Sequence, residues 1–223
     1  MKKLKEFIRR YPYALLFAYW PFYGIWYSVL QAITMERDPY PLVCGLDMEI
    51  PFCEWLIIPY VLWYLQLLGV GIYSFLYNPK GFIRLCLLVT GGTTFCLIVC
   101  TLFPMYFDRT GMVLYYNDNL LTDFVRFLQG FDPPTTVMPS MHVYVTLALH
   151  IGLCKDEYAR KNKLLLACSL VYSLTVCLAT VVTKQHSILD VGASVLLIGV
   201  MYFVAYVPKY KRLMRLATEP VLV

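Results

Sequence analysis

The sequence predicts an all-α polytopic membrane protein, a bundle of six transmembrane helices. Three observations carry this prediction. Of the 223 residues, 60% are hydrophobic and only 15% are charged, and the mean hydropathy is +0.62, so the chain is far more apolar than an average soluble domain. The apolar residues are grouped into runs of about twenty, the length of helix that crosses a bilayer. Basic and acidic connections also alternate along the chain, as they do when successive connections lie on opposite sides of a membrane.

The six expected spans follow one another without a linker, a low-complexity tract or an internal repeat. They cover residues 12–33, 55–77, 82–103, 137–154, 164–182 and 187–207. The first run follows a basic start that would suit a secretory signal. It is long and aromatic, however, and no small-residue cleavage site follows it, so we expect it to stay as a helix. Residues 1–223 are therefore expected to form one integral membrane domain.

The distribution of Lys and Arg predicts how this bundle is oriented. Fifteen of the 19 Lys and Arg fall in the N-terminus, the second and fourth connections and the C-terminal tail, whereas the first and third connections hold most of the acids. The basic residues of the tail are Lys209, Lys211, Arg212 and Arg215. By the positive-inside rule, both termini are expected in the cytoplasm of a protein of the cell membrane. The pI of 8.7 then needs no nucleic acid, because the basic residues serve topology and contacts to anionic membrane lipids.

The third connection, residues 104–136, is long for a minimal bundle. Leu120, Leu121, Phe124, Val125 and Leu128 recur there at helical spacing, with charged residues between them. This pattern is typical of a short amphipathic helix, which we expect to lie at the outer interface of the membrane. Such a helix would either help to admit a lipid or form a simple lid packed on the bundle.

Cysteine use indicates little special chemistry. Cys44 and Cys53 share the first outer connection, where a disulfide would be permitted, and free thiols are the alternative. No paired cysteine and histidine pattern suggests zinc. We therefore expect neither a metal nor another cofactor.

Two short motifs place histidines at the outer ends of apolar runs. They are Pro139-Ser140-Met141-His142 and His186-Ser187-Ile188-Leu189-Asp190. A titratable side chain near the bilayer is costly and usually marks a working site. His186 and Asp190 are four residues apart and share a helical face. A carboxylate there can accept a hydrogen bond from one ring nitrogen and leave the other for a substrate. His150, two helical turns from His142, is instead expected to form a hydrogen bond between helices.

The residues around these histidines suit a phosphate group. Ser140 is a favoured helix cap, and the amide groups that follow it form an end that binds anions, with Met141 and His142 in the first turn. Arg109 in the third connection and Lys184, two residues before His186, are candidate ligands for phosphate oxygens. Two histidines, a carboxylate and these cations favour phosphoryl transfer, in which one histidine attacks and the other protonates the leaving group.

These motifs resemble those of the type 2 phosphatidic acid phosphatase superfamily, which contains membrane lipid phosphatases and phosphotransferases. Its second signature, Pro-Ser-Gly-His, is similar to residues 139–142, and its third ends in His-x-x-x-Asp, as at His186 and Asp190. With the six-span layout, the resemblance covers nearly the whole chain. It implies that His186 forms a phosphohistidine, that Asp190 orients it and that His142 is the general acid, without a metal. It also implies an active site on the outer face and a lipid phosphate or diphosphate as substrate.

The chain departs from the family at several positions. The first signature is a Lys, six residues and then Arg-Pro, and Arg109 is the best match for its arginine. The departures are Leu102 for Lys, Thr110 for Pro, Met141 for Gly, and Ala179 and Thr180 for a Ser-Arg pair ahead of His186. Lys184 could partly replace the missing cations.

Three functions are compatible with this pattern. The first is a lipid phosphatase that transfers the phosphoryl group from His186 to water. The second is a lipid phosphotransferase, because the branch that makes inositol phosphorylceramide and sphingomyelin keeps the two histidines and the aspartate while losing much of the first signature. The third belongs to a different class: a lipid-binding or transport protein that retains the pocket without turnover.

Overall fold

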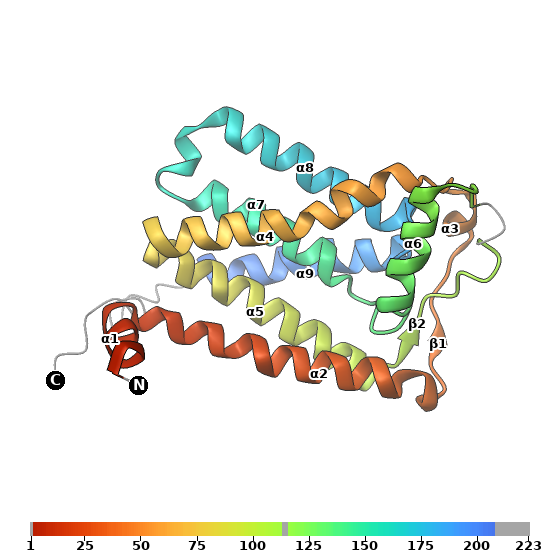
Figure 1. The fold of residues 1–223 in the computed structure, drawn as a ribbon, viewed down its shortest axis with the longest axis horizontal. Helices are drawn as coiled ribbons and strands as arrows, with labels where there is room; N and C mark the ends of the chain where they lie inside the picture. Colours follow the sequence, from red (N-terminus) through yellow and green to blue (C-terminus); the bar gives the residue numbers. More distant parts are fainter. Residues whose placement is uncertain (1, 113–115, 208–223) are drawn as a thin grey trace.

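The chain forms an elongated helical bundle (Figure 1). The computed structural model describes residues 2–112 and 116–207. The basic tail residues Lys209, Lys211, Arg212 and Arg215 lie outside this range. In the described residues, successive long helices run in alternating directions along the long axis of the molecule. Neighbours in sequence are thus antiparallel, as short connections between membrane helices require.

The helices and strands have the following bounds. They are α1 Lys2–Arg10, η1 Pro12–Ala18, α2 Tyr19–Ile33, η2 Thr34–Arg37, β1 Tyr40–Pro41, α3 Gly45–Glu49, η3 Glu54–Leu56, α4 Ile57–Tyr77, α5 Pro79–Leu102, β2 Met105–Tyr106, α6 Leu120–Phe131, α7 Met141–Lys155, η5 Ala159–Lys161, α8 Lys163–Val182 and α9 Ile188–Tyr206. The two short strands pair in parallel. Together with α3 and α6 they lie at the end of the bundle opposite α1 (Figure 1).

Helix α7 is the centre of the bundle, because it packs against α4, α5, α8 and α9. Its contact with α5 depends on one small residue. A side chain at Gly92 would collide with the ring of Tyr144, whose hydroxyl donates to the carbonyl of Leu88 at 2.7 Å. A glycine at this position therefore lets the two helices approach closely, as small residues do between membrane helices.

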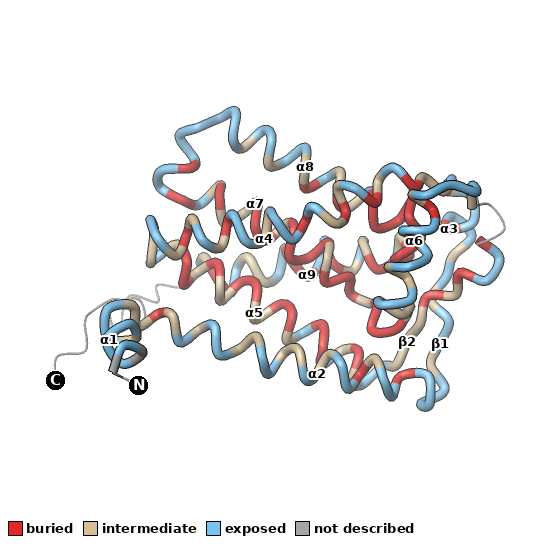
Figure 2. Tube along the Cα trace, in the orientation of Figure 1, coloured by how far each residue is buried: buried red, intermediate tan, exposed pale blue. Residues whose placement is uncertain are grey.

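The long helices carry many exposed residues (Figure 2), and a large share of these have large hydrophobic side chains. Among the described residues, four helical segments are long and apolar enough to cross a membrane: 54–77, 79–102, 163–182 and 188–206. Fewer than half of the residues in each are buried within the protein, the largest share being 44%. Exposed apolar surface of this extent is compatible with a membrane protein. The described part of the chain is thus all-α, with four candidate membrane-spanning helices.

The other two expected spans are less regular than the sequence suggests. Residues 12–33 divide into the 3₁₀ segment η1 and the 15-residue helix α2. Pro21 lies in the first turn of α2, a position that tolerates proline, so the helix restarts there. The run 137–154 becomes helical only at Met141, which leaves a 15-residue helix. The expected helix in the third connection is present as α6, capped by Asn119, whose side chain accepts from the amide of Thr122 at 3.0 Å.

Candidate functional site

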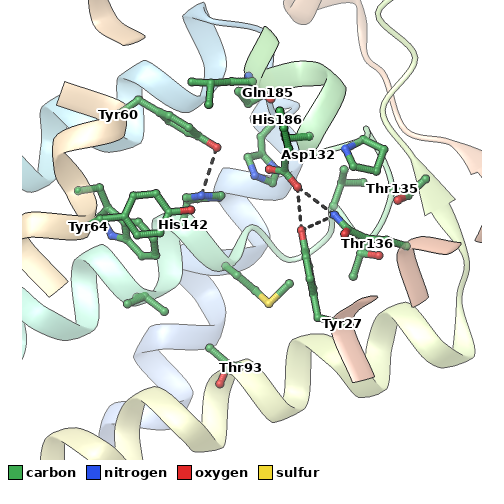
Figure 3. A pocket seen from close by; sticks show the side chains of 18 of the residues that line it. Tyr27, Tyr60, Tyr64, Thr93, Asp132, Thr135, Thr136, His142, Gln185 and His186 are labelled. Atoms are coloured by element: carbon green, nitrogen blue, oxygen red, sulfur yellow. Dashed lines mark hydrogen bonds between the residues drawn. The ribbon is translucent and has the colours of Figure 1, made fainter. Parts of the chain in front are cut away.

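A cavity of about 450 Å³ lies between α2 and α4 and reaches both motif histidines. His142 and His186 face it from the first turn of α7 and the turn before α9, and their ring centroids are 5.7 Å apart. Figure 3 shows Tyr60 and His142 on one side of this space and Tyr27 and Asp132 on the other. The two motifs, far apart in sequence, therefore share one cavity of a size typical for small-molecule sites.

The His186–Asp190 pair has the geometry expected from its spacing. Nδ1 of His186 lies 3.0 Å from Oδ2 of Asp190, and the Asp190 side chain is fully buried. The same carboxylate oxygen accepts the backbone amide of Ser187 at 3.1 Å. Because Nδ1 is held by the carboxylate, Nε2 is the ring nitrogen left for a ligand.

The turn that carries His186 is fixed by a distant segment, α3. The buried carboxylate of Asp47 accepts the hydroxyl of Ser187 at 2.6 Å and the amide of Ile188 at 2.9 Å. Lys184, in the left-handed region with φ 56°, donates its ammonium to the carbonyls of Asp47 and Ile50 at 2.7 and 2.5 Å. We call residues 183–190 the clamped turn. Charge-assisted hydrogen bonds of this kind hold the backbone of His186 in one position.

Lys184 therefore has a different environment from the one expected for a phosphate ligand. Its ammonium is already bonded to two backbone carbonyls, and its side chain does not belong to the described lining of the cavity. Burial lowers the pKa of Lys184, and nearby Asp47 opposes that shift. The side chain on this turn that does face the cavity is Gln185, which the sequence pattern does not single out.

His142 is packed between two aromatic rings. Its ring centroid lies 4.9 Å from those of both Tyr60 and Trp63, and its Nε2 is 3.1 Å from the Tyr60 hydroxyl. Its Nδ1 is buried without a hydrogen-bond partner in the described chain. Nδ1 is thus the nitrogen that can serve a ligand.

The expected cap of α7 is present. The Ser140 side chain accepts from the amide of Val143 at 3.4 Å, so His142 does lie in the first helical turn. Met141 lines the cavity beside His142, where its sulfur accepts the Tyr23 hydroxyl at 3.0 Å. The thioether occupies space that the glycine of the resembled signature would leave open.

Many polar atoms of this cavity have no partner within the described residues. Five lining residues each carry one buried polar atom without a hydrogen-bond partner: Trp63 Nε1, Thr135 Oγ1, Thr136 Oγ1, His142 Nδ1 and Gln185 Nε2. The indole, the two hydroxyls and the amide all have a hydrogen to donate. Buried donors of this kind are normally satisfied, so their concentration at one cavity suits a ligand rich in acceptor oxygens.

Arg109 supplies a positive charge near this set, although it is not one of the residues that line the cavity. Both of its terminal nitrogens are buried and unpaired in the described chain. The guanidinium interacts electrostatically with Tyr116, Asp132 and Tyr60, and the last two line the cavity. Burial lowers the pKa of Arg109, while these three neighbours raise it. An unpaired buried guanidinium is costly, and a phosphate would satisfy it. We call Arg109, Thr135, Thr136 and His142 the donor wall.

Two further expectations concern residues outside the cavity. His150 forms the expected bond between helices, since its Nδ1 lies 3.1 Å from the hydroxyl of Ser169 on α8. Cys44 and Cys53 are free thiols. In the described residues, no group of three His, Cys, Asp or Glu side chains gathers as metal ligands would.

Comparison with known proteins adds no assignment. No family model matches the chain, and neither a curated protein nor a solved structure is similar to it.

Asp47, Asp132 and Gln185 are site residues that sequence reasoning does not identify. In the sequence, Asp132 is only part of a turn-setting Asp-Pro-Pro stretch, and Asp47 is only one of several acids of the first connection. For the two aspartates the available signal is weak, since each is only an acid beside a break in an apolar pattern, and Gln185 has no such signal. Their contacts with residues 101 and 140 positions away in sequence, at Gln31 and Ser187, follow no local periodicity.

Proposed function

We propose that this protein is a membrane lipid phosphatase that uses His186 as its nucleophile, similar to the type 2 phosphatidic acid phosphatase superfamily. The observation that carries the proposal is the His186–Asp190 pair, with Nδ1 and Oδ2 3.0 Å apart, facing a second histidine across a shared cavity. Either motif alone is a weak signal. The two motifs converge on one cavity that also holds unpaired donors, and the buried cation of Arg109 interacts with the lining residues Asp132 and Tyr60; this combination suits a phosphoryl-transfer site.

In the first step, Nε2 of His186 attacks the phosphorus of the lipid phosphate. The N–P bond forms as the bond from phosphorus to the lipid oxygen breaks, and His142 gives a proton to that departing oxygen through Nδ1. Asp190 stabilises the positive ring through Nδ1–H. Arg109 and the hydroxyls of Thr135 and Thr136 stabilise the charge that develops on the phosphate oxygens.

In the second step, water attacks the phosphorus of the phosphohistidine. His142, now neutral, accepts the proton from that water, the N–P bond breaks and inorganic phosphate leaves. A lipid hydroxyl in place of water would make the same protein a phosphotransferase. The acceptor therefore decides between the two enzyme classes, with the same residues in the same roles.

We further propose that the chain crosses the cell membrane six times, with α2 and α7 as the additional spans, α6 at the interface and the cavity on the outer side. The test uses two exposed sites at opposite ends of the bundle, Asp118 and Tyr158. In intact cells, an impermeant thiol reagent should label Asp118→Cys but not Tyr158→Cys. The reverse pattern would contradict the orientation.

The activity is tested by release of phosphate from purified protein in detergent. A panel of lipid phosphates is assayed with and without diacylglycerol or ceramide as acceptor. His186→Ala should abolish turnover. His150→Ala is the matched control, because it also removes a hydrogen-bonded histidine from this chain but lies outside the cavity, and it should keep most of the activity. Binding of the lipids without phosphate release or transfer would favour the non-catalytic alternative.

A further inference from the structure

The two ring nitrogens of His142 have different environments. Nε2 lies 3.1 Å from the hydroxyl of Tyr60 (Figure 3), whereas Nδ1 is buried without a hydrogen-bond partner in the described chain. The proposed mechanism needs Nδ1 to give a proton in the first step and to accept one in the second. A neutral imidazole has a single N–H, which either nitrogen can hold. The remaining proton must therefore be kept on Nε2 while Nδ1 is bare.

The hydroxyl of Tyr60 lies on an otherwise apolar stretch of α4, residues 57–63. Tyr60 is buried, and a buried hydroxyl is costly unless it is hydrogen-bonded. A phenylalanine ring would fill the same space without that cost. Among the described residues, the only hydrogen-bond partner of this hydroxyl is His142. The histidine, and not packing, thus accounts for a tyrosine at this position.

The surroundings of Tyr60 hold its ring in place. The ring belongs to one buried cluster with Val125 of α6 and Ala179 of α8. The carbonyl of the preceding residue, Pro59, accepts the hydroxyl of Tyr172 on α8 at 2.8 Å, which ties this turn of α4 to its neighbour. The hydroxyl is therefore in position before a substrate binds, as groups that orient a catalytic side chain need to be.

The two motif histidines are oriented by different kinds of partner. His186 is held at Nδ1 by the carboxylate of Asp190, whereas His142 is held at Nε2 by a neutral hydroxyl. The carboxylate of Asp132 interacts with His142 only from beyond ion-pair distance. An adjacent carboxylate makes an imidazole retain its proton, and a hydroxyl does not. A neutral partner suits a group that releases and recovers a proton in each turnover.

We propose that Tyr60 is the positioning residue of the general acid: its hydroxyl accepts Nε2–H of His142 throughout the reaction and so directs the transferred proton to Nδ1. In the first step, Nδ1–H goes to the departing lipid oxygen while Nε2–H stays bonded to Tyr60. In the second step, bare Nδ1 takes the proton of the attacking water. The inference rests on the proposed function and adds a residue that lies outside both motifs.

The direction of this hydrogen bond is tested without turnover. The chain has three histidines, so the purified full chain labelled with ¹⁵N-histidine gives few ring-nitrogen NMR signals in detergent. The signals of His142 are those lost in His142→Ala. At a pH at which the ring is neutral, the wild type should carry hydrogen on Nε2 and none on Nδ1. Tyr60→Phe should give a mixture of the two tautomers, because nothing then distinguishes the nitrogens.

The effect on catalysis is measured in the first turnover, which includes transfer to His186 but not the later attack of water. One substrate is a lipid phosphate, whose alkoxide leaving group needs a proton, and the other is 4-nitrophenyl phosphate, whose leaving group needs none. Tyr60→Phe should slow release of the lipid alcohol about 10- to 100-fold and keep release of nitrophenol within about threefold of the wild type. A purely structural role would slow both alike.

Tyr73→Phe is the matched control. It removes another hydrogen-bonded hydroxyl from α4, one that donates to Asp156 at 3.0 Å and lies outside the cavity. It should leave both release rates and the tautomer of His142 unchanged.

Four outcomes would overturn the role of Tyr60. They are hydrogen on Nδ1 of neutral His142 in the wild type, an unchanged tautomer in Tyr60→Phe, equal slowing of both substrates, and slowing of neither. If Tyr60→Phe does not fold, the tautomer of the wild type still decides. The proposed function fails separately, if the wild type releases no alcohol from any lipid phosphate, and the NMR measurement then still shows whether Tyr60 orients the ring.

Discussion

The clamped turn is tied by hydrogen bonds to a segment about 140 residues away in sequence. The donor wall, by contrast, leaves polar atoms of all four of its residues without a partner in the described chain. Gln185, whose amide faces the cavity from the clamped turn, is an exception to this contrast.

The difference has an energetic meaning. A satisfied buried polar network rigidifies its residues, while an unsatisfied one costs stability until a ligand completes it. The clamped turn therefore holds the nucleophile in place before substrate arrives, and the donor wall is where binding energy is gained. Substitutions that break the clamped turn should therefore lower the stability of the protein, whereas removal of an unpaired group from the donor wall should preserve or raise it.

The largest effect is expected at Asp190, the residue of the clamped turn that contacts the nucleophile His186 directly. Asp190→Asn should lower turnover on the order of 10³- to 10⁴-fold, because the amide cannot stabilise a positive His186 ring or hold its tautomer. The asparagine oxygen can still accept the Ser187 amide, so the fold should persist. Phosphate release measures the turnover, and circular dichroism on the same preparation measures whether the fold persists. A loss of less than tenfold would mean that His186 does not act as a nucleophile oriented by this carboxylate.

Arg109 tests the donor wall. Arg109→Met should raise KM for a lipid phosphate by about 10- to 100-fold, since charge-assisted bonds to phosphate are lost. It should leave the free energy of unfolding unchanged or raise it by about 1 kcal/mol, because a buried guanidinium without partners is removed. Steady-state kinetics in mixed micelles gives KM, and chemical denaturation in the same micelles gives the free energy of unfolding. Destabilisation beyond about 1 kcal/mol with unchanged KM would assign Arg109 a packing role instead.

Asp47 tests the clamped turn and should behave in the opposite way. Asp47→Ala leaves the Ser187 hydroxyl and the Ile188 amide unpaired, which should cost about 2–4 kcal/mol of stability. Turnover should fall about tenfold with little change in KM, because the histidine loses its position while the donor wall is intact. Asp47→Asn should recover part of both. Normal kcat in a destabilised Asp47→Ala protein would show that the clamp supports only the fold.

The smallest effect on activity is expected at Asp156, at the other end of the bundle. Its carboxylate accepts from Tyr73, Asn78 and the amides of Tyr158 and Ala159. Burial by itself would raise the pKa of Asp156, but these hydrogen bonds lower it overall. A carboxyl group with a lowered folded-state pKa stabilises the protein above its unfolded pKa and loses that effect as pH falls. The wild type should therefore lose stability below about pH 4. Asp156→Asn should lose part of this pH dependence and keep normal turnover.

The features that could be predicted from the sequence are those that depend on residues close together along the chain. Four of the expected spans agree with membrane-length helices, because a run of about twenty apolar residues is a local property. The pairing of His186 with Asp190 and the Ser140 cap also follow from local spacing. The run 12–33 could not be predicted in detail, since whether Pro21 kinks a helix or starts one depends on how α2 packs on α5.

The rest of the site depends on contacts between distant segments. Lys184 lies two residues from His186, so proximity in sequence favours it as a phosphate ligand. Its left-handed backbone turns the ammonium toward α3 instead. Asp132 lies ten residues before His142, and only the tertiary structure brings its carboxylate to Tyr27 and Gln31.

The account depends most on a covalent bond between phosphorus and His186, which can be trapped directly. Wild-type protein is mixed with a ³²P-labelled lipid phosphate, quenched in alkali within milliseconds and separated on a denaturing gel, with His186→Ala and His150→Ala beside it. We predict a phosphoenzyme stable to alkali and labile to acid in the wild type and His150→Ala, and none in His186→Ala. Label that persists in His186→Ala, or turnover by the wild type without any labelled protein, would contradict the account.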